Sequence, residues 1–460
     1  MTELIDKALR DSTDTRAIIS GRGVLDQTGT MFTDLFGDAQ CILVADENTW
    51  GVAGEPVKAS LEAAGVTLVE PYIFPGTPTL YAGYENVVKL RDHLSAVDAI
   101  VCSIASGTLN DIAKLASGEL GRGYLNVCTA ASMDGYAAFG ATITRDGFKI
   151  TRDCPAPAGL VADLDLMAAA PQRLTGTGYG DLIEKVPSGA DWLVADELGI
   201  EAVDPLVWDL VQPPLVAALS DPEGLAAGNP DAIGLLAEEL ILSGLAMQAH
   251  QSSRPASGAG HNFSHQWEME GHGLDWEPPL SHGNKVGIGT VASCAVYELL
   301  PGLDVAGVDP AARAAEWLSE ADNDARVEAL QPLPAIRAAA LAQSRAKYVP
   351  QDQAAARVQL IKDHWPAILQ RVAPQVMTPA DIADKLRRAG APYHPGQFGI
   401  DQDKLKLTYY QSQTIRSRYT IMDALFELGL LDAVVETLFG PGGYWAETPV
   451  PTEGHLDPTS

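Results

Sequence analysis

The chain is predicted to fold as an α/β nucleotide-binding domain over residues 1–170, followed by an all-α domain over residues 171–445. In the first part, short apolar runs alternate with helical patterns, which is typical of a sheet with many parallel strands. From about residue 171 the strand-like runs fade and amphipathic helical patterns dominate. Residues 446–460 are rich in Pro, Gly and acidic residues and have no periodicity, so we expect a disordered tail.

The predicted strands end in polar turns. The run CILVAD ends in Asp46, and residues 98–117 have the pattern of a strand, a glycine turn and a helix. Residues 124–135 form a strand followed by a turn, and a hairpin is expected around Asp146-Gly147. Ligands of α/β sheets bind at the carboxyl ends of the strands, so these turns are candidate binding segments.

Composition excludes several classes of partner. The formal net charge is −29 over 460 residues, which disfavours nucleic acid because phosphate contacts need Lys and Arg. An anionic small substrate remains possible, but it needs a local basic pocket. No run reaches the roughly 20 apolar residues of a membrane helix, and the polar N-terminus does not have the pattern of a signal peptide. We therefore expect no membrane span.

The cysteines are odd in number and lack a CxxC pair, so buried thiols and a reducing cytoplasm are expected. They are Cys41, Cys102, Cys128, Cys154 and Cys294.

Five of the nine histidines lie between His250 and His282. His261 and His265 are four residues apart, so on a helix they share one face. His282 opens a glycine-rich run after a polar loop. Two imidazoles and one upstream carboxylate would form a three-ligand metal site with an open position. Histidines at this spacing are also found on helices that bind no metal.

The turn ASGTLND places Ser106, Gly107 and Thr108 between a strand and a helix start. Backbone N–H groups there favour a phosphate, and glycine allows close approach of the ligand. The alternative is a tight turn with a capping residue and Asp111 in the first helical turn. Asp46 is similarly either a ribose-binding acid or a solvated residue at a strand end.

Polar side chains also occupy two later turns. Thr129, Ser132 and Asp134 could hold a nicotinamide or a substrate hydroxyl, or they could serve only the turn. Asp181 is expected at a helix start, either as a cap or as a carboxylate that faces the histidines. Lys185, one turn on, could bind a substrate phosphate.

Seven ordered blocks resemble the glycerol-1-phosphate dehydrogenases, in the group that includes bacterial proteins of the arabinose-operon type. That group belongs to the iron-containing alcohol dehydrogenase and dehydroquinate synthase superfamily. The blocks are DENTW at 46–50, SGTLNDIAK at 106–114, TAASMDGYA at 129–137, GYGDLIEKVPSGADW at 178–192, SGAGHNFSH at 257–265, LSHGNKVGIGT at 280–290 and IRSRYTIMDALFELGLL at 415–431.

The resemblance implies a dehydroquinate synthase-like fold, with the site in the cleft between an α/β nucleotide-binding domain and a helical domain that binds metal and substrate. Carried over residue by residue, the metal ligands fall on Asp181, His261 and His282. The cofactor and substrate positions fall on Asp46, Ser106, Gly107, Thr108 and Asp111, on Thr129, Ser132 and Asp134, and on His265. The chain departs from the family pattern at Ala105, where Gly is usual, and at Gly260, where Glu is usual.

The activity that the resemblance implies is hydride transfer between NAD or NADP and dihydroxyacetone phosphate, giving sn-glycerol 1-phosphate, with one divalent metal ion. Zinc, nickel and iron all suit such ligands. Asp134 and His265 are candidate proton carriers, and Lys185 and Lys285 are candidates for the substrate phosphate.

Three alternatives stay open: a glycerol or other polyol or alcohol dehydrogenase, a dehydroquinate-synthase-like cyclase, and a non-catalytic binding or scaffold protein. The expected partner is a small phosphorylated triol or ketone, and a homodimer or larger homo-oligomer is possible.

Overall fold

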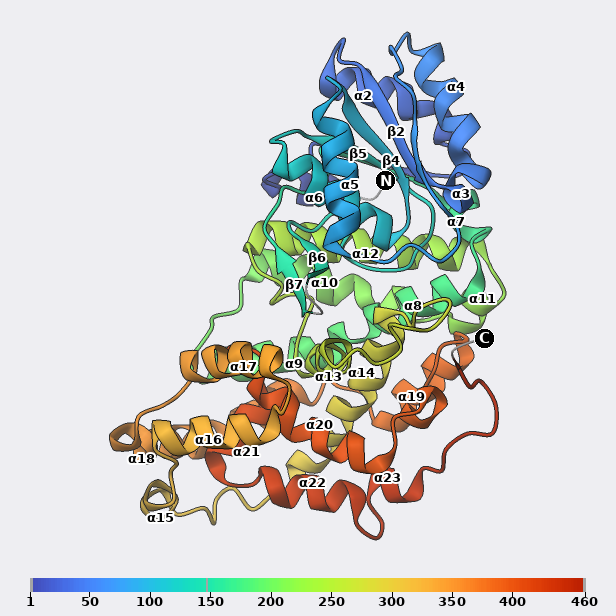
Figure 1. The fold of residues 1–460 in the computed structure, drawn as a ribbon. Helices are drawn as coiled ribbons and strands as arrows, with labels where there is room; N and C mark the ends of the chain where they lie inside the picture. Colours follow the sequence, from blue (N-terminus) through green and yellow to red (C-terminus); the bar gives the residue numbers. More distant parts are fainter. Residues whose placement is uncertain (1–2, 146–147, 458–460) are drawn as a thin grey trace.

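The computed structural model describes residues 3–145 and 148–457 (Figure 1). Its first part is built on a six-stranded sheet in which all paired strands run parallel. In spatial order the strands are β1 (Ala17–Gly21), β8 (Gly159–Asp163), β5 (Tyr124–Cys128), β4 (Ile100–Ala105), β2 (Cys41–Asp46) and β3 (Tyr72–Phe74). The predicted α/β architecture is confirmed.

Helices cover both faces of this sheet, which explains why its strands are almost continuously apolar. In β2 the side chains of Ile42 and Val44 pack in one buried cluster with α5 (Tyr84–Ser95) and α6 (Gly107–Glu119). Leu43 points to the opposite face, because side chains alternate along a strand. It packs in a separate cluster with α2 (Thr28–Phe36) and α4 (Glu55–Ala63).

A two-stranded antiparallel hairpin follows the sheet's fifth strand. It pairs β6 (Ala141–Arg145) with β7 (Phe148–Arg152), as the sequence predicts. The expected turn at Asp146-Gly147 lies outside the described residues.

After β8 ends at Asp163, every regular element in the described part of the chain is a helix (Figure 1). The helices that matter for the site are α8 (Gln172–Ile183), α9 (Lys185–Glu197), α12 (Pro230–His250), α13 (Ala259–Met269) and α14 (His282–Leu299). A single large buried cluster joins them to the later helices and to one face of the sheet. The prediction of a mostly helical second half is confirmed.

Among the described residues, α12 is the one helix long and apolar enough to cross a membrane by length and composition alone, with a mean hydropathy of 1.4. Inside the fold, 78% of that stretch is buried. A helix that is apolar all round is also what a large protein core requires. The expected lack of a membrane span stays a prediction.

Part of the segment predicted to be a disordered tail, residues 453–456, is hydrogen-bonded to a distant part of the fold. The N–H of Leu456 donates a hydrogen bond to the Gln397 carbonyl at 2.7 Å. The Gln397 amide in turn donates to the carbonyls of Glu453 and Gly454, at 3.1 and 3.2 Å. The composition of the tail lacks an apolar run, but these bonds to a distant segment hold residues 453–456 in place.

Candidate metal and nucleotide site

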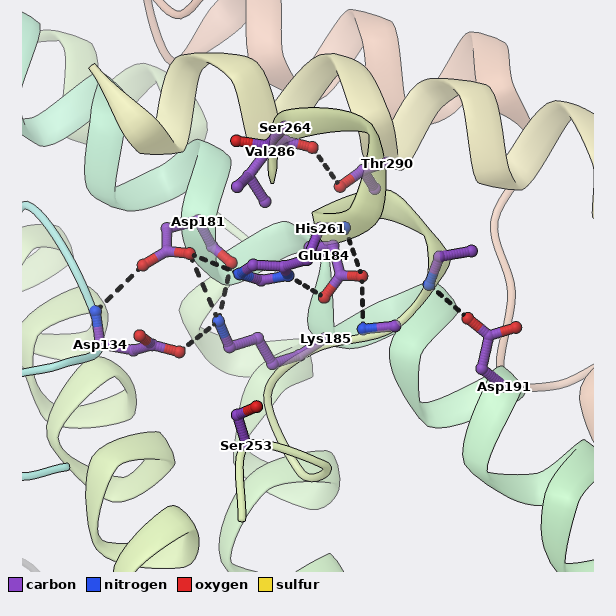
Figure 2. Close-up of polar contacts among 12 residues, drawn as sticks. Asp134, Asp181, Glu184, Lys185, Asp191, Ser253, His261, Ser264, Val286 and Thr290 are labelled. Carbon is purple, nitrogen blue, oxygen red and sulfur yellow. Dashed lines mark hydrogen bonds and ion pairs between the residues drawn. The ribbon is translucent and has the colours of Figure 1, made fainter. Parts of the chain in front are cut away.

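Asp181, His261 and His282 come together at one point of the helical part. One ligand atom from each lies within 4.8 Å of the other two. Oδ1 of Asp181 is 3.4 Å from Nε2 of His261 (Figure 2). Asp181 stands in the last turn of α8 and not at a helix start, so the expectation of a capping position was wrong.

Glycines allow the three helices that carry these side chains to pack closely. A Cβ added at Gly283 of α14 would lie 2.0 Å from the Thr177 carbonyl of α8. A Cβ added at Gly289 would lie 2.1 Å from the Gly260 carbonyl of α13. Real Cβ atoms never approach so closely, so the glycine-rich run after His282 serves helix packing and brings the three side chains to one place.

Asp181 is buried and strongly held as a carboxylate. Its Oδ2 accepts a hydrogen bond from the backbone N–H of Asp134 at 3.0 Å, whereas its buried Oδ1 accepts none. Burial alone would raise the pKa of Asp181, but the charge of Lys185 and the two histidine rings together hold it well below its usual range. A buried anionic oxygen without a hydrogen bond, facing two imidazoles, is suited to a divalent cation.

Lys185 is fully buried behind this group. Its Nζ lies 2.6 Å from Oδ2 of Asp134 and 3.7 Å from Oδ1 of Asp181, and it donates to the Asp181 carbonyl at 2.8 Å. A cleft lies between the sheet and the helices, and neither Lys185 nor Lys285 is among the described residues that line it. Both side chains are completely buried. The structure therefore does not support either lysine as a ligand of the substrate phosphate.

Each histidine of the group has a carboxylate on its second ring nitrogen. Nδ1 of His261 lies 2.9 Å from Oε2 of Glu184, and Nδ1 of His282 lies 3.0 Å from Oε1 of Glu268. Carboxylates in this position fix the ring orientation of metal-binding histidines and leave Nε2 to the metal.

Gly260 leaves room for Glu184 beside His261. A Cβ at Gly260 would lie 2.9 Å from Cγ of Glu184. Glu184 reaches His261 from the α8–α9 junction (Figure 2). It passes through the space that this glycine leaves.

His265 lies beside the group as a neutral ring. Its ring stacks on that of His282, with centroids 5.7 Å apart and an interplanar angle of 11°. Burial and the charge of Arg416 lower the pKa of His265 well below its usual value. Arg416 lies 3.2 Å from Nδ1. A guanidinium can only donate, so Nδ1 accepts and Nε2 carries the proton.

A cleft of about 660 Å³ lies between the sheet and the helices. This volume is within the usual range for a small-molecule or cofactor site. From the sheet side it is lined by Asp46, Ser106, Gly107, Thr108, Asp111, Ser132 and Asp134, and from the helical side by Asp181, His261, His265 and His282.

Three other predicted residues either lie away from the cleft or also form hydrogen bonds that support the fold. Thr129 is buried, its N–H donates to the Ala105 carbonyl, and it is not among the described lining residues. Asp46 lines the cleft, but its Oδ1 also caps α3 (Glu47–Thr49) by accepting from the Thr49 N–H at 2.8 Å. Asp111 accepts a hydrogen bond from the Thr142 N–H at 3.2 Å, so it also ties the hairpin to α6.

Sequence reasoning missed three of the residues that support the site. Glu184, Glu268 and Arg416 were given no role in the site. The signal for Glu268 was its spacing, because it lies three residues after His265 on the same helix. Nothing local could reveal Arg416, which lies 151 residues from the ring it contacts.

A profile described as iron-containing alcohol dehydrogenase matches residues 19–171. Two solved structures show the same fold. A probable glycerol dehydrogenase from Sinorhizobium meliloti covers 92% of this chain and 98% of its own, with a TM-score of 0.59 and 15% identity. An iron-containing alcohol dehydrogenase from Thermotoga maritima covers 92% and 98%, with a TM-score of 0.55 and 12% identity. The fold is thus that of the iron-containing alcohol dehydrogenases.

Two proteins with similar sequences identify the family within this fold class. A glycerol-1-phosphate dehydrogenase [NAD(P)+] from Bacillus subtilis is 30% identical over 82% of this chain and 83% of its own length. One from Halalkalibacterium halodurans is 37% identical over 56% of this chain, and the match spans 64% of that relative's length. The chain belongs to the glycerol-1-phosphate dehydrogenase family.

Proposed function

We propose that this chain is a metal-dependent, NAD(P)-linked dehydrogenase that interconverts dihydroxyacetone phosphate and sn-glycerol 1-phosphate. The observation that carries the proposal is the meeting of Asp181, His261 and His282 at the wall of a cleft whose other wall is the carboxyl edge of a parallel sheet. That edge is where such sheets bind dinucleotides. Membership of the family supports the choice of substrate.

Asp181, His261 and His282 would hold one divalent ion, with zinc, nickel and iron as candidates. When bound, the ion supplies Lewis acidity that polarises a substrate carbonyl or lowers the pKa of a substrate hydroxyl. Ser106, Gly107 and Thr108 at the start of α6 would bind the cofactor's pyrophosphate. Asp46 would contact the adenosine ribose, and Ser132 the nicotinamide side.

Two side chains would handle the substrate's protons and hydroxyls. His265 presents a neutral Nε2–H donor, because Arg416 engages its Nδ1. Asp134 lines the cleft, and its Oδ2 already accepts from Ser243 at 3.1 Å and pairs with Lys185. Asp134 would serve as the acceptor for a substrate hydroxyl or water.

The direct test is an assay of the purified protein, loaded in turn with each candidate metal, with NADH or NADPH and dihydroxyacetone phosphate. We expect oxidation of the reduced nicotinamide and formation of the sn-1 enantiomer of glycerol phosphate. Turnover of dihydroxyacetone and glycerol at equal or higher kcat/KM would instead indicate a polyol dehydrogenase, like the probable glycerol dehydrogenase with a similar structure.

A cytoplasmic location is proposed from the five cysteines, all of which carry thiols.

Glu184→Gln is expected to weaken metal binding by about 10- to 100-fold. The amide keeps the shape of the side chain and can still accept from the Gly258 N–H, now 3.0 Å from Oε1. It removes the negative charge beside Nδ1 of His261, which makes the ring a poorer metal ligand. Competition with a chelator measures the change. Glu436→Gln, on the exposed face of α22 (Leu431–Phe439), is the control, and equal affinities of the two variants would contradict the role given to Glu184.

Metal affinity is expected to fall as the pH is lowered. Burial opposes the charged form of the His261 ring, but the carboxylates of Glu184 and Asp181 outweigh burial and raise the pKa to about 9. The metal-free ring is then protonated at neutral pH, and the ion must displace that proton. The apparent Kd should rise by about tenfold for each pH unit below 9 and level off above it. A titration at several pH values decides, and an unchanged Kd between pH 7 and 9 would refute the prediction.

A further inference from the structure

The loop between β5 and β6, residues 129–140, forms part of the cleft wall on the side of the sheet. This stretch contains no helix or strand, so no repeating backbone hydrogen bonds hold its shape. The loop residues that line the cleft are Ser132, Met133, Asp134, Gly135, Ala138, Phe139 and Gly140. Bonds from outside the loop must therefore satisfy its backbone groups and hold the wall in place.

Lys114 of α6 supplies three of these bonds. Its Nζ donates to the backbone carbonyls of Gly135, Ala138 and Gly140, at 2.7, 2.9 and 3.1 Å. The side chain is completely buried, and Asp111, one turn earlier on α6, lies 3.8 Å from Nζ. An ammonium group has three N–H donors, so the loop uses all of them. The loop is thus folded around a buried cation.

The part of the loop that Lys114 holds is joined to the metal group. Gly135 directly follows Asp134 in the chain. The backbone N–H of Asp134 donates to Oδ2 of Asp181 at 3.0 Å, and its carboxylate pairs with Lys185. The position of the Gly135 carbonyl therefore decides where the Asp134 amide meets Asp181.

Helix α6 also begins at the turn that is proposed to bind the cofactor's pyrophosphate. Lys114 lies seven residues after Gly107, which is about 10 Å along the helix. One helix thus carries the pyrophosphate turn at its start and, further along, the side chain that holds the loop beside the metal group. Lys114 itself is not among the described residues that line the cleft, so it acts through the loop and is not a ligand of the cofactor.

We propose that Lys114 is a positioning residue for hydride transfer. By holding the loop at three carbonyls, it places Ser132 and Asp134 between the nicotinamide end of the cofactor and the metal group. The proposal rests on the proposed function, which requires nicotinamide and substrate to meet there. Reacting atoms must lie about 3–3.5 Å apart, and a misplacement of about 1 Å can cost about 100-fold in rate.

Other bonds keep the loop attached when Lys114 is replaced. The side-chain amide of Gln248 on α12 donates to the Ala137 carbonyl. The hydroxyl of Tyr136 donates to the Ala130 carbonyl at 2.8 Å, within the loop itself. The expected consequence of losing the ammonium group is therefore a shift of the loop, and not unfolding of the protein.

The test is a single-turnover measurement with the metal-loaded protein, NADH and dihydroxyacetone phosphate, which compares Lys114→Met with the unmodified protein. Methionine has a similar volume but cannot donate to the carbonyls. The rate constant for NADH oxidation should fall by about 10- to 100-fold. The Kd for NADH should change by less than about threefold, because the start of α6 is untouched. Slower oxidation of NADH deuterated at the nicotinamide C4 shows that the measured step is hydride transfer.

The amplitude of the same reaction separates positioning from a merely structural role. Loss of folded protein lowers the amplitude and leaves the rate constant unchanged, whereas a displaced loop lowers the rate constant of molecules that still bind NADH. Lys89→Met, at an exposed position of α5, is the control and should match the unmodified protein. An unchanged rate constant in Lys114→Met overturns the proposal, as does a loss confined to the amplitude.

Lys114→Gln carries the test if the methionine variant does not fold by circular dichroism. Its amide is shorter than the lysine side chain and donates to at most two carbonyls, so the rate constant should again fall. An unchanged rate constant in this variant overturns the proposal. Failure of both variants to fold also overturns it, because Lys114 would then serve the fold and not the position of the loop.

Hydrogen exchange of the loop needs no turnover and keeps this outcome distinct from that of the proposed function. Backbone amides of residues 132–140 should exchange faster in Lys114→Met, and those of β5 should not. Unchanged exchange in the loop overturns the positioning role whatever the substrate is. If the unmodified protein does not reduce dihydroxyacetone phosphate, the proposed function fails, and the single-turnover comparison is made with the ketone that it does reduce.

Discussion

His261→Ala is expected to abolish metal binding and activity together, with turnover of dihydroxyacetone phosphate reduced by about 10³-fold or more. The imidazole lies between Asp181 and Glu184, so its loss removes the central ligand and leaves two buried carboxylates facing a cavity. Two remaining ligands do not hold an ion in competition with water and buffer. Metal content after dialysis and initial rates with saturating metal measure both effects.

A matched control separates the role of this histidine from any general effect of removing one. His364 is half exposed and pairs with Glu197 at 2.9 Å, on a face formed by α18 (Gln351–Val372). His364→Ala should keep its metal and its activity. If His261→Ala turned over substrate in metal-free buffer at the rate of the unmodified protein, the proposed chemistry at Asp181, His261 and His282 would be refuted.

The sheet was predictable from local sequence because its strands are buried on both faces. The run CILVAD was predictable as a strand because nearly every residue of β2 is buried and therefore apolar. Asp46 marks the end of the strand because it caps the next helix. The turn at Ser106 was predicted by the same reasoning. The fold class needed no more than the alternation of such runs with helices.

The spacing of residues in the sequence predicted only part of the candidate metal site. His261 and His265 lie on one helix, so their common face follows from their separation. Asp181 is 80 residues before His261 in the sequence, and only resemblance to a family indicated that the two meet. Gly283 and Gly289 contained the physical signal, since glycines in a helix predict a close helix contact, but a single sequence does not say with which helix.

Lys185 shows why a side chain's role is harder to predict than its position. Its placement one turn after Asp181 was correct, but the charge that decides its role comes from Asp134, 51 residues earlier in the sequence. Two carboxylates neutralise the ammonium group and keep it from the cleft. Arg416, in a block that the resemblance had already marked, is given a role beside His265 only by the ring that it contacts.

Lys185→Met is expected to lower the free energy of unfolding by about 3–5 kcal/mol, the usual cost of removing one partner from a buried ion pair. Methionine fills a similar volume without charge, so Asp181 and the adjacent Asp134 would lose the ammonium group that pairs with both of them. Urea unfolding of the metal-free protein at pH 7 measures the loss. Lys89→Met, at an exposed position of α5, should change stability by less than about 0.5 kcal/mol.

The pH dependence of that loss identifies its cause. Lys185 helps to depress the pKa of Asp181, so the stability from this pairing is fully present above the usual aspartate pKa of 3.8 and is lost as the pH falls through the depressed value. In the variant, burial without the lysine favours the protonated form of Asp181, which tolerates burial better as the pH drops. The stability difference between the two proteins should therefore be largest at pH 7 and shrink towards pH 4. A difference that stays constant over this range would mean that lost packing, and not the unpaired carboxylates, destabilises the variant.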